Sequence, residues 1–388
     1  MYFEFMNKTK LCAGENALTQ LQYECDQYHI KHPLILTDST LYQLKYVAKI
    51  TKHLSIPYQL YTDIPVDSSI HVVKDIYHFY QQHQCDGIIA LGGGSVLDTA
   101  KGVFLMLSQE CDSFDEILGF EVMKKGKNIP FFAIPTTSGT GSEATSVAVI
   151  HHPQKNVKLE IISQYIQSDV AFLDPCLTIH LPLRVTSATA VDALVHAIEA
   201  YTCSGKNIMS DIYASTAISL ISQNILKVIE KPKDKEIRSN LALASYIAGG
   251  AFSNSMVGIV HAIGHALGAV CHIPHGEAMS MLLIPCMKFN LDTNASLYGE
   301  ILLYLDKEKY LSTKPEDLAD VTISYLSNLL KILHSQTKLP ISLNEVLSLK
   351  ENMDEIAEKA LNDGALLVNE KYVYKKDIID ILGGKYGY

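Results

Sequence analysis

The character of the sequence changes near residue 180, and this change most limits the folds open to the chain. Before that point, short apolar runs alternate with helical patterns, whereas after Pro182 the residues predict one helix after another. Strand–helix alternation is typical of a parallel sheet covered on both faces. At 388 residues the chain is also too long for one ordinary domain. We therefore predict an α/β domain over residues 1–182 and an all-helical domain over residues 183–388.

Apolar runs that end in turn residues mark the expected strands of the first half. The expected strands are 32–39, 85–94, 129–137 and 170–175, and helices are expected over 69–84 and 95–108. Two segments with alternating character, 146–152 and 157–163, predict a hairpin. In the second half the expected helices are 184–203, 207–229, 235–254, 257–270, 277–290 and 294–304, with more beyond.

Charge and cysteine content exclude several classes of function. The chain has 42 acidic and 32 basic residues and a net charge of −10, so it repels phosphate backbones and is not expected to bind nucleic acid. Its eight cysteines are widely separated and form no CxxC pair, which argues against a disulfide framework. The N-terminus lacks a signal-peptide pattern, and no run resembles a membrane span. We expect a soluble, cytoplasmic protein without a membrane partner.

A glycine-rich turn follows the strand at 85–91. Gly92, Gly93, Gly94 and Ser95 join this strand to the next helix, and Ser95 is the expected N-cap. Glycines at the carboxyl end of a parallel strand let a phosphate approach the backbone, where the N-terminus of the following helix stabilises its charge. A tight turn with a capping serine is the simpler alternative. Three consecutive glycines exceed what a turn needs, so we favour phosphate binding.

Two other strand ends carry polar groups that suit a nucleotide. The common GxGxxG fingerprint is absent, but Asp38 ends the strand at 32–37 and could accept hydrogen bonds from an adenosine ribose. Such a carboxylate would disfavour a 2′-phosphate. The loop at 135–143 is rich in glycine and hydroxyl residues and offers donors for phosphate, ribose or carboxamide. Each feature alone is common, since aspartates and polar loops often follow strands.

Two helical segments bring together residues that suit a transition metal. Asp192 and His196 have i,i+4 spacing, as do His261 and His265, and His275 follows in a Pro-His-Gly turn. An oxygen and several imidazole nitrogens are ligands for zinc or ferrous iron rather than for calcium or magnesium. Spacing does not decide between His261 and His265, because they share a helical face. Capping and core polar groups are the alternative, but so many buried groups would need partners without a metal.

Five segments in order, GGGSVLDTAK, IPTTSGTGSEATSVAVI, DALVHAIEAY, HAIGHALGA and IPHGEA, resemble the iron-containing (group III) alcohol dehydrogenase family over essentially the whole chain. The resemblance implies the dehydroquinate synthase-like fold, with an α/β nucleotide-binding domain followed by a helical metal-binding domain. It implies hydride transfer between NAD(H) and a small uncharged primary alcohol, diol or aldehyde. The implied metal is Fe²⁺, with Zn²⁺ as the alternative. A homodimer or larger homo-oligomer is expected by analogy.

The resemblance also implies roles for individual residues. The metal ligands are Asp192, His196, His261 and His275, and His265 is a nearby non-ligand that relays protons. Phe252 and Val147 lie on the substrate side. The residues that contact the cofactor are Asp38, Gly93, Gly94, Ser95, Asp98, Thr136, Thr137, Thr145 and Lys158.

Some residues depart from the family pattern, and other functions stay open. Ala190 replaces a glycine beside Asp192, and residues 369–371 read Asn-Glu-Lys where Asn-Pro-Arg is frequent. The alternatives are a glycerol dehydrogenase-like zinc enzyme, a dehydroquinate synthase-like lyase, a metal-free reductase and a nucleotide-responsive module without activity. We disfavour the lyase because Ala197, Ile198, Ala262 and Ile263 make the surroundings of the expected metal site apolar and small rather than basic.

Overall fold

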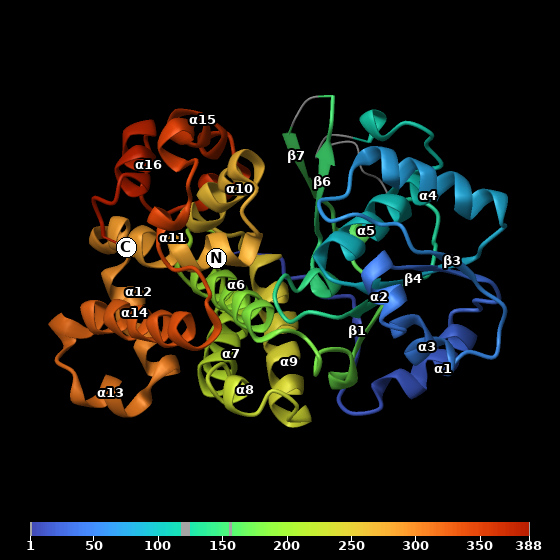
Figure 1. Ribbon diagram of the computed structural model, residues 1–388, viewed down its shortest axis with the longest axis horizontal. Coiled ribbons are helices and arrows are strands. Elements are labelled where there is room, and N and C mark those ends of the chain that lie inside the picture. The colour runs from blue at the N-terminus through green and yellow to red at the C-terminus, as the bar shows by residue number, and fades with distance from the viewer. Residues whose placement is uncertain (1, 118–124, 155–156, 388) are drawn as a thin grey trace. The chain divides into compact units, whose positions relative to one another are not determined.

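The computed structural model describes residues 2–117, 125–154 and 157–387. The chain divides into two compact units, Met6–His180 and Leu181–Tyr388, and the second also includes the first five residues. The first is an α/β unit and the second is helical throughout its described residues (Figure 1). The predicted fold class is therefore confirmed.

The α/β unit contains a six-stranded parallel sheet with the order β1-β8-β5-β4-β2-β3. Its strands are β1 (Lys10–Ala13), β2 (Pro33–Leu36), β3 (Gln59–Tyr61), β4 (Gly87–Gly92), β5 (Phe131–Pro135) and β8 (Val170–Leu173). The helices of this unit are α1 (Leu21–Gln27), α2 (Ser39–Gln43), α3 (Tyr46–Thr51), α4 (Ile70–Gln82) and α5 (Gly94–Gln109). The predicted hairpin is confirmed as the antiparallel pair β6 (Val147–His152) and β7 (Val157–Ile162).

Successive side chains of each central strand enter two different hydrophobic cores. In β4, Ile88 packs in the core that includes residues of α4 and α5, while Ile89 packs in the core that includes α1 and α3. Phe131 and Phe132 of β5 divide in the same way. Because both faces of the sheet are buried, its central strands are continuous apolar runs. Such runs are easy to recognise, and these strands could therefore be predicted from the sequence.

The helical unit has one large core, in which α6, α7 and α9 pack against one another. Its helices are α6 (Leu183–Thr202), α7 (Ile208–Asn224), α8 (Lys227–Glu230), α9 (Lys235–Phe252), α10 (Ile259–Cys271), α11 (His275–Phe289), α12 (Leu291–Leu305), α13 (Lys307–Ser312), α14 (Leu318–Thr337), α15 (Leu349–Leu361) and α16 (Lys375–Leu382). The helix predicted over 207–229 is interrupted at Ile225 and Leu226, which keep right-handed helical φ and ψ angles, and it is therefore divided into α7 and α8. The Asn224 side chain donates to the carbonyl of Leu220 at 2.8 Å and occupies an acceptor near the end of α7.

Two expectations about the whole chain can be compared with the structure. Each of the eight cysteines is a free thiol, as predicted. The segment Ile208–Glu230 is long and apolar enough to cross a membrane by composition alone. It is divided between α7 and α8, and Ala214, Ile218 and Ile221 of α7 are buried in the helical core. The segment therefore packs partly into the helical core, with 39% of its apolar window buried.

Candidate metal centre

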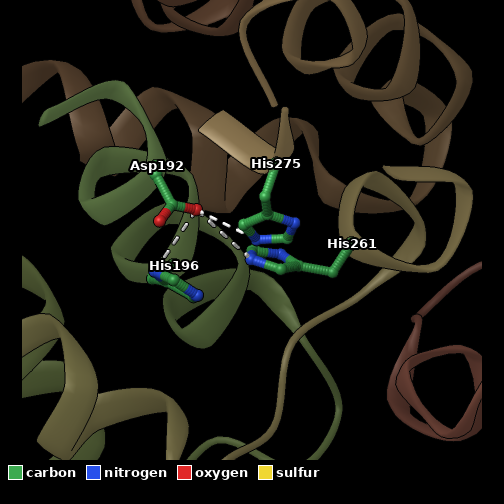
Figure 2. A group of neighbouring side chains, drawn as sticks. All are labelled: Asp192, His196, His261 and His275. Carbon is green, nitrogen blue, oxygen red and sulfur yellow. Dashed lines mark ion pairs between the residues drawn. The ribbon is translucent and has the colours of Figure 1, made fainter. Parts of the chain in front are cut away.

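Four side chains from three helices converge within the helical unit. Asp192 and His196 lie one turn apart on α6, His261 lies in the first turn of α10, and His275 begins α11 (Figure 2). Each offers one ligand atom, and these atoms all lie within 4.8 Å of one another. The helical spacing of α6 thus produced the shared face that the sequence predicted.

The carboxylate of Asp192 is the centre of this group. Its Oδ1 atom lies 3.2 Å from His275 Nε2, 3.8 Å from His196 Nδ1 and 4.0 Å from His261 Nε2. Ligand atoms that each lie about 2 Å from one cation are about 3 to 4 Å apart. The four side chains therefore have the spacing that a single bound cation requires.

Three of these four ligand atoms are buried and have no hydrogen-bond partner. Asp192, His196 and His261 are only 2%, 5% and 2% exposed, and Asp192 Oδ1, His196 Nδ1 and His261 Nε2 make no hydrogen bond. An unpaired buried polar atom costs about 1 to 3 kcal/mol, so three that face one another need a shared partner. A divalent cation satisfies all three at once, and the donor set fits zinc or ferrous iron.

The protonation states also suit a cation. Burial lowers the pKa of His196 to about 3 and holds the pKa of His261 well below its ordinary value, so both imidazoles are neutral at pH 7. Burial alone would raise the pKa of Asp192, but the imidazoles of His196, His275 and His261 outweigh it and hold this pKa far below its usual range. Ionised carboxylate and neutral imidazoles are the forms that bind metals.

A second carboxylate, which the sequence analysis missed, orients one of the histidines. Glu199 of α6 contacts His261 Nδ1 through Oε2 at 2.5 Å and accepts from the backbone N–H of Val260 through Oε1 at 2.7 Å. Burial raises the pKa of Glu199 to about 7. With Nδ1 engaged, Nε2 of His261 is the nitrogen left for a metal. Glu199 lies seven residues after Asp192, so helical periodicity could have placed it on the same face.

His265 is paired with a distant aspartate rather than with the four converging residues. Its Nδ1 atom lies 2.8 Å from Oδ2 of Asp363, which follows α15, and its ring stacks on His275 with centroids 5.3 Å apart. Burial would raise the pKa of Asp363, but the hydrogen bond and the charge of His265, together with the Ala365 N–H and the charge of His261, outweigh it and lower this pKa. Nearly one hundred residues separate the pair, so no local pattern in the sequence could have revealed it.

Glycine and aromatic packing shape the surroundings of the four residues. A Cβ atom on Gly276 would lie 2.6 Å from the carbonyl oxygen of Ala188, so this glycine lets the start of α11 approach α6 closely. The ring of Phe252 stacks on His196 with centroids 4.3 Å apart and an interplanar angle of 13°. The sequence analysis placed Phe252 on the substrate side, and the structure places it directly against a candidate ligand.

The apolar residues by which we disfavoured a lyase do not line an open site. Ala197, Ile198 and Ile263 lie in the main helical core, and Ala262 packs in a small cluster with Phe252. All four are buried. Their small apolar side chains therefore carry no information about substrate charge.

In the α/β unit, the three glycines at the end of β4 and the start of α5 differ in the contacts that a side chain would make. A Cβ atom on Gly92 would lie 2.5 Å from the Val96 side chain, and one on Gly94 would lie 2.8 Å from Thr140, so packing requires both glycines. A Cβ atom on Gly93 would meet only Thr137, at 3.4 Å and 3.5 Å, which are ordinary contact distances. Packing within the protein therefore does not explain why residue 93 is a glycine.

The helix after this turn begins differently from the prediction. Gly93 is the N-cap of α5, and Ser95 lies inside the first turn, so the expectation that Ser95 caps the helix was wrong. The Ser95 hydroxyl instead accepts from the backbone N–H of Asp67 at 3.4 Å. Only Gly93 separates β4 from α5, so the helix starts at Gly94 and its cap is a glycine without a side chain.

Several of the other expected cofactor residues make hydrogen bonds or ion pairs in and around the loops next to the glycine turn. Asp98 accepts from the Ser142 hydroxyl at 2.7 Å and from the Val149 N–H at 3.0 Å. Thr136 donates its N–H to Gly92, which keeps the loop after β5 beside the glycine turn. Lys158 pairs with Asp67 at 2.8 Å, and Asp38 caps α2 by accepting from the Leu41 N–H.

A buried lysine that the sequence analysis missed supports this loop. Lys101 of α5 donates to the Thr145 hydroxyl at 2.7 Å and to the carbonyl of Val147 at 2.6 Å. Burial lowers the pKa of Lys101 to about 8, and burial raises the pKa of Glu143 to about 7. A lysine on a helix is usually exposed to solvent, so its type and position gave no signal.

Comparison with known proteins identifies the family. The model of the iron-containing alcohol dehydrogenases matches residues 8–175, and that of the Fe-containing alcohol dehydrogenase family, C-terminal, matches residues 186–386. The chain belongs to the iron-containing alcohol dehydrogenase family. It is therefore a metal-dependent, NAD-linked alcohol oxidoreductase, as the resemblance implied.

Relatives of this alcohol dehydrogenase cover almost its whole length. A probable alcohol dehydrogenase, EutG, from Escherichia coli (strain K12) is 33% identical over 96% of this chain and 91% of its own. An NADPH-dependent butanol dehydrogenase from Clostridium saccharobutylicum is 33% identical over 90% of this chain and 89% of its own. The crystal structure of a 1,3-propanediol oxidoreductase has a TM-score of 0.93, 29% identity and 99% coverage of both chains.

Proposed function

We propose that this alcohol dehydrogenase binds one divalent cation, Fe²⁺ or alternatively Zn²⁺, through Asp192, His196, His261 and His275, and that it interconverts a small uncharged primary alcohol or diol with its aldehyde using NAD(H). The observation that carries the ligand assignment is the set of three buried atoms, Asp192 Oδ1, His196 Nδ1 and His261 Nε2, that face one another without hydrogen-bond partners. When bound, the cation would polarise the substrate oxygen and stabilise the negative charge that develops on it.

The protein residues have separate tasks in this proposal. Asp192 supplies the one full negative charge of the ligand set, while the neutral imidazoles leave a net positive charge on the bound site to attract an alcohol oxygen. Glu199 fixes the ring nitrogen that His261 presents. Phe252 limits the movement of His196 by stacking on its ring.

We propose that His265 takes and returns the hydroxyl proton of the substrate. Its Nδ1 atom is held by Asp363 and its side chain is 21% exposed, so the imidazole is in reach of solvent for proton exchange. General acid–base groups of this kind contribute about 10² to 10⁴-fold to a rate. We therefore place His265 beside the ligand set rather than in it.

The cofactor proposal concerns the loops after β2, β4 and β5. The start of the 16-residue helix α5, with Gly93 free of close packing, suits a cofactor phosphate. Ser95, Asp98, Thr136, Thr137, Thr145 and Lys158 would contact the cofactor or hold the loops that do, and Val147 would lie on the substrate side. Asp38 would favour NAD over NADP through its charge. A homodimer and a cytoplasmic location stay predictions from the family resemblance.

The substrate class is supported by the named activities of the relatives, which include butanol and 1,3-propanediol enzymes. The test is an NADH-oxidation panel with ethanal, propanal, butanal and 3-hydroxypropanal, run anaerobically with added Fe²⁺ and then with Zn²⁺. We expect turnover of at least one uncharged short aldehyde and a clear preference among chain lengths. Turnover confined to carboxylated or phosphorylated aldehydes would contradict the proposed substrate class.

Elemental analysis of anaerobically purified protein separates the two metals. We expect about one equivalent of iron per chain, loss of activity in air and recovery with reductant and Fe²⁺. One equivalent of zinc with oxygen-stable activity would select the alternative metal at the same four residues.

A further inference from the structure

The segment Val368–Lys371 is called here the 368–371 strap. It makes a hydrogen bond at or next to one end of each helix that carries a candidate metal ligand, α6, α10 and α11. The carbonyl of Val368 accepts from the backbone N–H of Ser204, just after α6, at 2.8 Å. Lys371 donates to the carbonyl of Phe289, the last residue of α11, at 2.8 Å and pairs with Asp292. The strap is distant in sequence from all four ligands but joins the ends of the helices that hold them.

The most important contact of the strap is the hydrogen bond that it makes with the start of α10. The first N–H groups of any helix lack partners within the helix. At the start of α10, Asn369 Oδ1 accepts from the N–H of Ile259 at 3.3 Å, and Glu199 accepts from the N–H of Val260 at 2.7 Å. Two side chains from other parts of the chain therefore share the task of capping the turn that contains His261.

A glycine makes this shared cap possible. Gly258 is the N-cap of α10 and offers no side chain of its own. A Cβ atom at this position would lie 3.1 Å from Asn369 Oδ1 and 3.1 Å from Glu199 Oε1. The glycine thus allows the asparagine and the carboxylate to reach the first turn of α10 together.

The asparagine is itself held in one orientation. Asn290, which is buried between α11 and α12, donates to Asn369 Oδ1 at 3.0 Å and accepts from Asn369 Nδ2 at 3.2 Å. Asn369 Nδ2 also donates to the carbonyl of Lys371 at 2.6 Å. Because both amide donors of Asn369 are used in this way, Oδ1 is the atom that faces α10.

We propose that Asn369 is a positioning residue of the metal centre, which acts by holding the start of α10 so that Nε2 of His261 faces Asp192. This inference depends on the ligand set proposed above. Replacing Asn369 leaves the Ile259 N–H without this partner, removes two hydrogen bonds of the Asn290 side chain and frees the first turn of α10 to move. The effect therefore reaches the metal through His261 and not through any contact of Asn369 with the metal.

The experiment measures Zn²⁺ affinity of the full chain, stripped of metal with a chelator and titrated against a chromogenic competitor. We expect Asn369→Ala to weaken Zn²⁺ binding by about 10 to 100-fold, the range typical of residues that support a metal ligand. The visible spectrum of the Co²⁺-loaded variant should also change, because the geometry at His261 is altered. Retention of wild-type affinity and spectrum would overturn the proposal.

Two further variants separate this proposal from general destabilisation and from failure of the ligand assignment. Lys371→Met removes the other anchor of the strap, at Phe289 and Asp292, and should lower the melting temperature without changing Zn²⁺ affinity. His261→Ala should lose Zn²⁺ affinity by more than Asn369→Ala. If His261→Ala binds Zn²⁺ as tightly as the wild type, the proposed ligand set is wrong. If His261→Ala loses affinity but Asn369→Ala binds Zn²⁺ as tightly as the wild type, the positioning role of Asn369 is wrong. Equal losses in Asn369→Ala and Lys371→Met would also reject it, since the strap would then act only through stability.

Discussion

Glu199 contacts Nδ1 of His261 at 2.5 Å, and this contact leaves Nε2 of the same ring 4.0 Å from the carboxylate of Asp192. The two carboxylates of α6 therefore act on opposite sides of one imidazole. In the proposed metal centre Asp192 would bind the same cation as this ring, and Glu199 would decide which ring nitrogen faces that cation. Carboxylates that hold a metal-binding histidine in this way fix both its tautomer and its orientation.

Replacing Glu199 with glutamine should therefore weaken metal binding. The amide group can donate to Nδ1, which would place the ring proton on Nε2 and block metal coordination. We expect Zn²⁺ affinity of Glu199→Gln to fall by about 10 to 100-fold, measured by competition with a chromogenic chelator. The control is Glu300→Gln, because Glu300 accepts from Tyr201 but touches none of the four ligands. Equal affinities in both variants would contradict the role of Glu199.

Loss of the His265 side chain should lower turnover but leave the metal bound, whereas loss of the His261 side chain should weaken metal binding. We expect His265→Ala to lower turnover on the order of 100-fold, the size of a general acid–base contribution, while the bound metal stays near one equivalent per chain. Asp363→Ala should lower turnover in the same direction but by less, because Asp363 only orients the ring. Turnover and metal content, measured on the same samples, check this. Loss of metal from His265→Ala in step with activity would make His265 a ligand.

Asp38 can be tested without damaging the helix that it caps. Its Oδ1 atom accepts from the N–H of Leu41 at 2.8 Å, and serine caps helices about as well as aspartate. We expect Asp38→Ser to keep the melting temperature, to lower KM for NADPH and to raise KM for NADH. Steady-state kinetics with both cofactors measures the change. Asp63→Ser, which removes a carboxylate just after the neighbouring strand β3, should leave the preference unchanged.

Glu143 should make the stability of the protein depend on pH. Its folded-state pKa is about 7 against an ordinary value of 4.5, because burial disfavours the charged form. Between these two values the folded state binds more protons than the unfolded state, so the contribution of Glu143 to stability is present below pH 4.5 and is lost as the pH rises to 7. A shift of this size corresponds to about 3 kcal/mol.

Urea unfolding of the wild type and of Glu143→Gln at pH 5 and pH 8 tests this dependence. Glutamine cannot ionise, so the variant should gain stability relative to the wild type as the pH rises, by about 3 kcal/mol at most. The difference between the two proteins is the relevant quantity, because other groups titrate in both. A difference that is the same at both pH values would show that Glu143 is already charged in the folded protein at pH 5, so that its pKa is not raised.

The central strands of the sheet could be read from the sequence, but its edges could not. Strands β2, β4, β5 and β8 are buried and appear as continuous apolar runs. The two strands that were not predicted, β1 and β3, are four and three residues long and lie at the two edges of the sheet. A short edge strand has one strand neighbour and a partly exposed face, so its sequence carries little periodic signal.

In the candidate site too, pairs of residues close in sequence could be predicted, whereas pairs far apart in sequence could not. Asp192 and His196 share a helical face, and periodicity places them together. No local pattern links His265 to Asp363 or Ile259 to Asn369, because these pairs meet only through the packing of helices far apart in the chain. Sequence reasoning therefore found the four converging side chains but not most of the residues that orient them.

Anomalous X-ray diffraction at the iron absorption edge, on crystals grown anaerobically with Fe²⁺, tests the central claim most directly. The account predicts one strong peak within about 2.0 to 2.3 Å of ligand atoms from Asp192, His196, His261 and His275. A crystal of the active enzyme with no peak among these four side chains, or with the metal bound elsewhere, would contradict it.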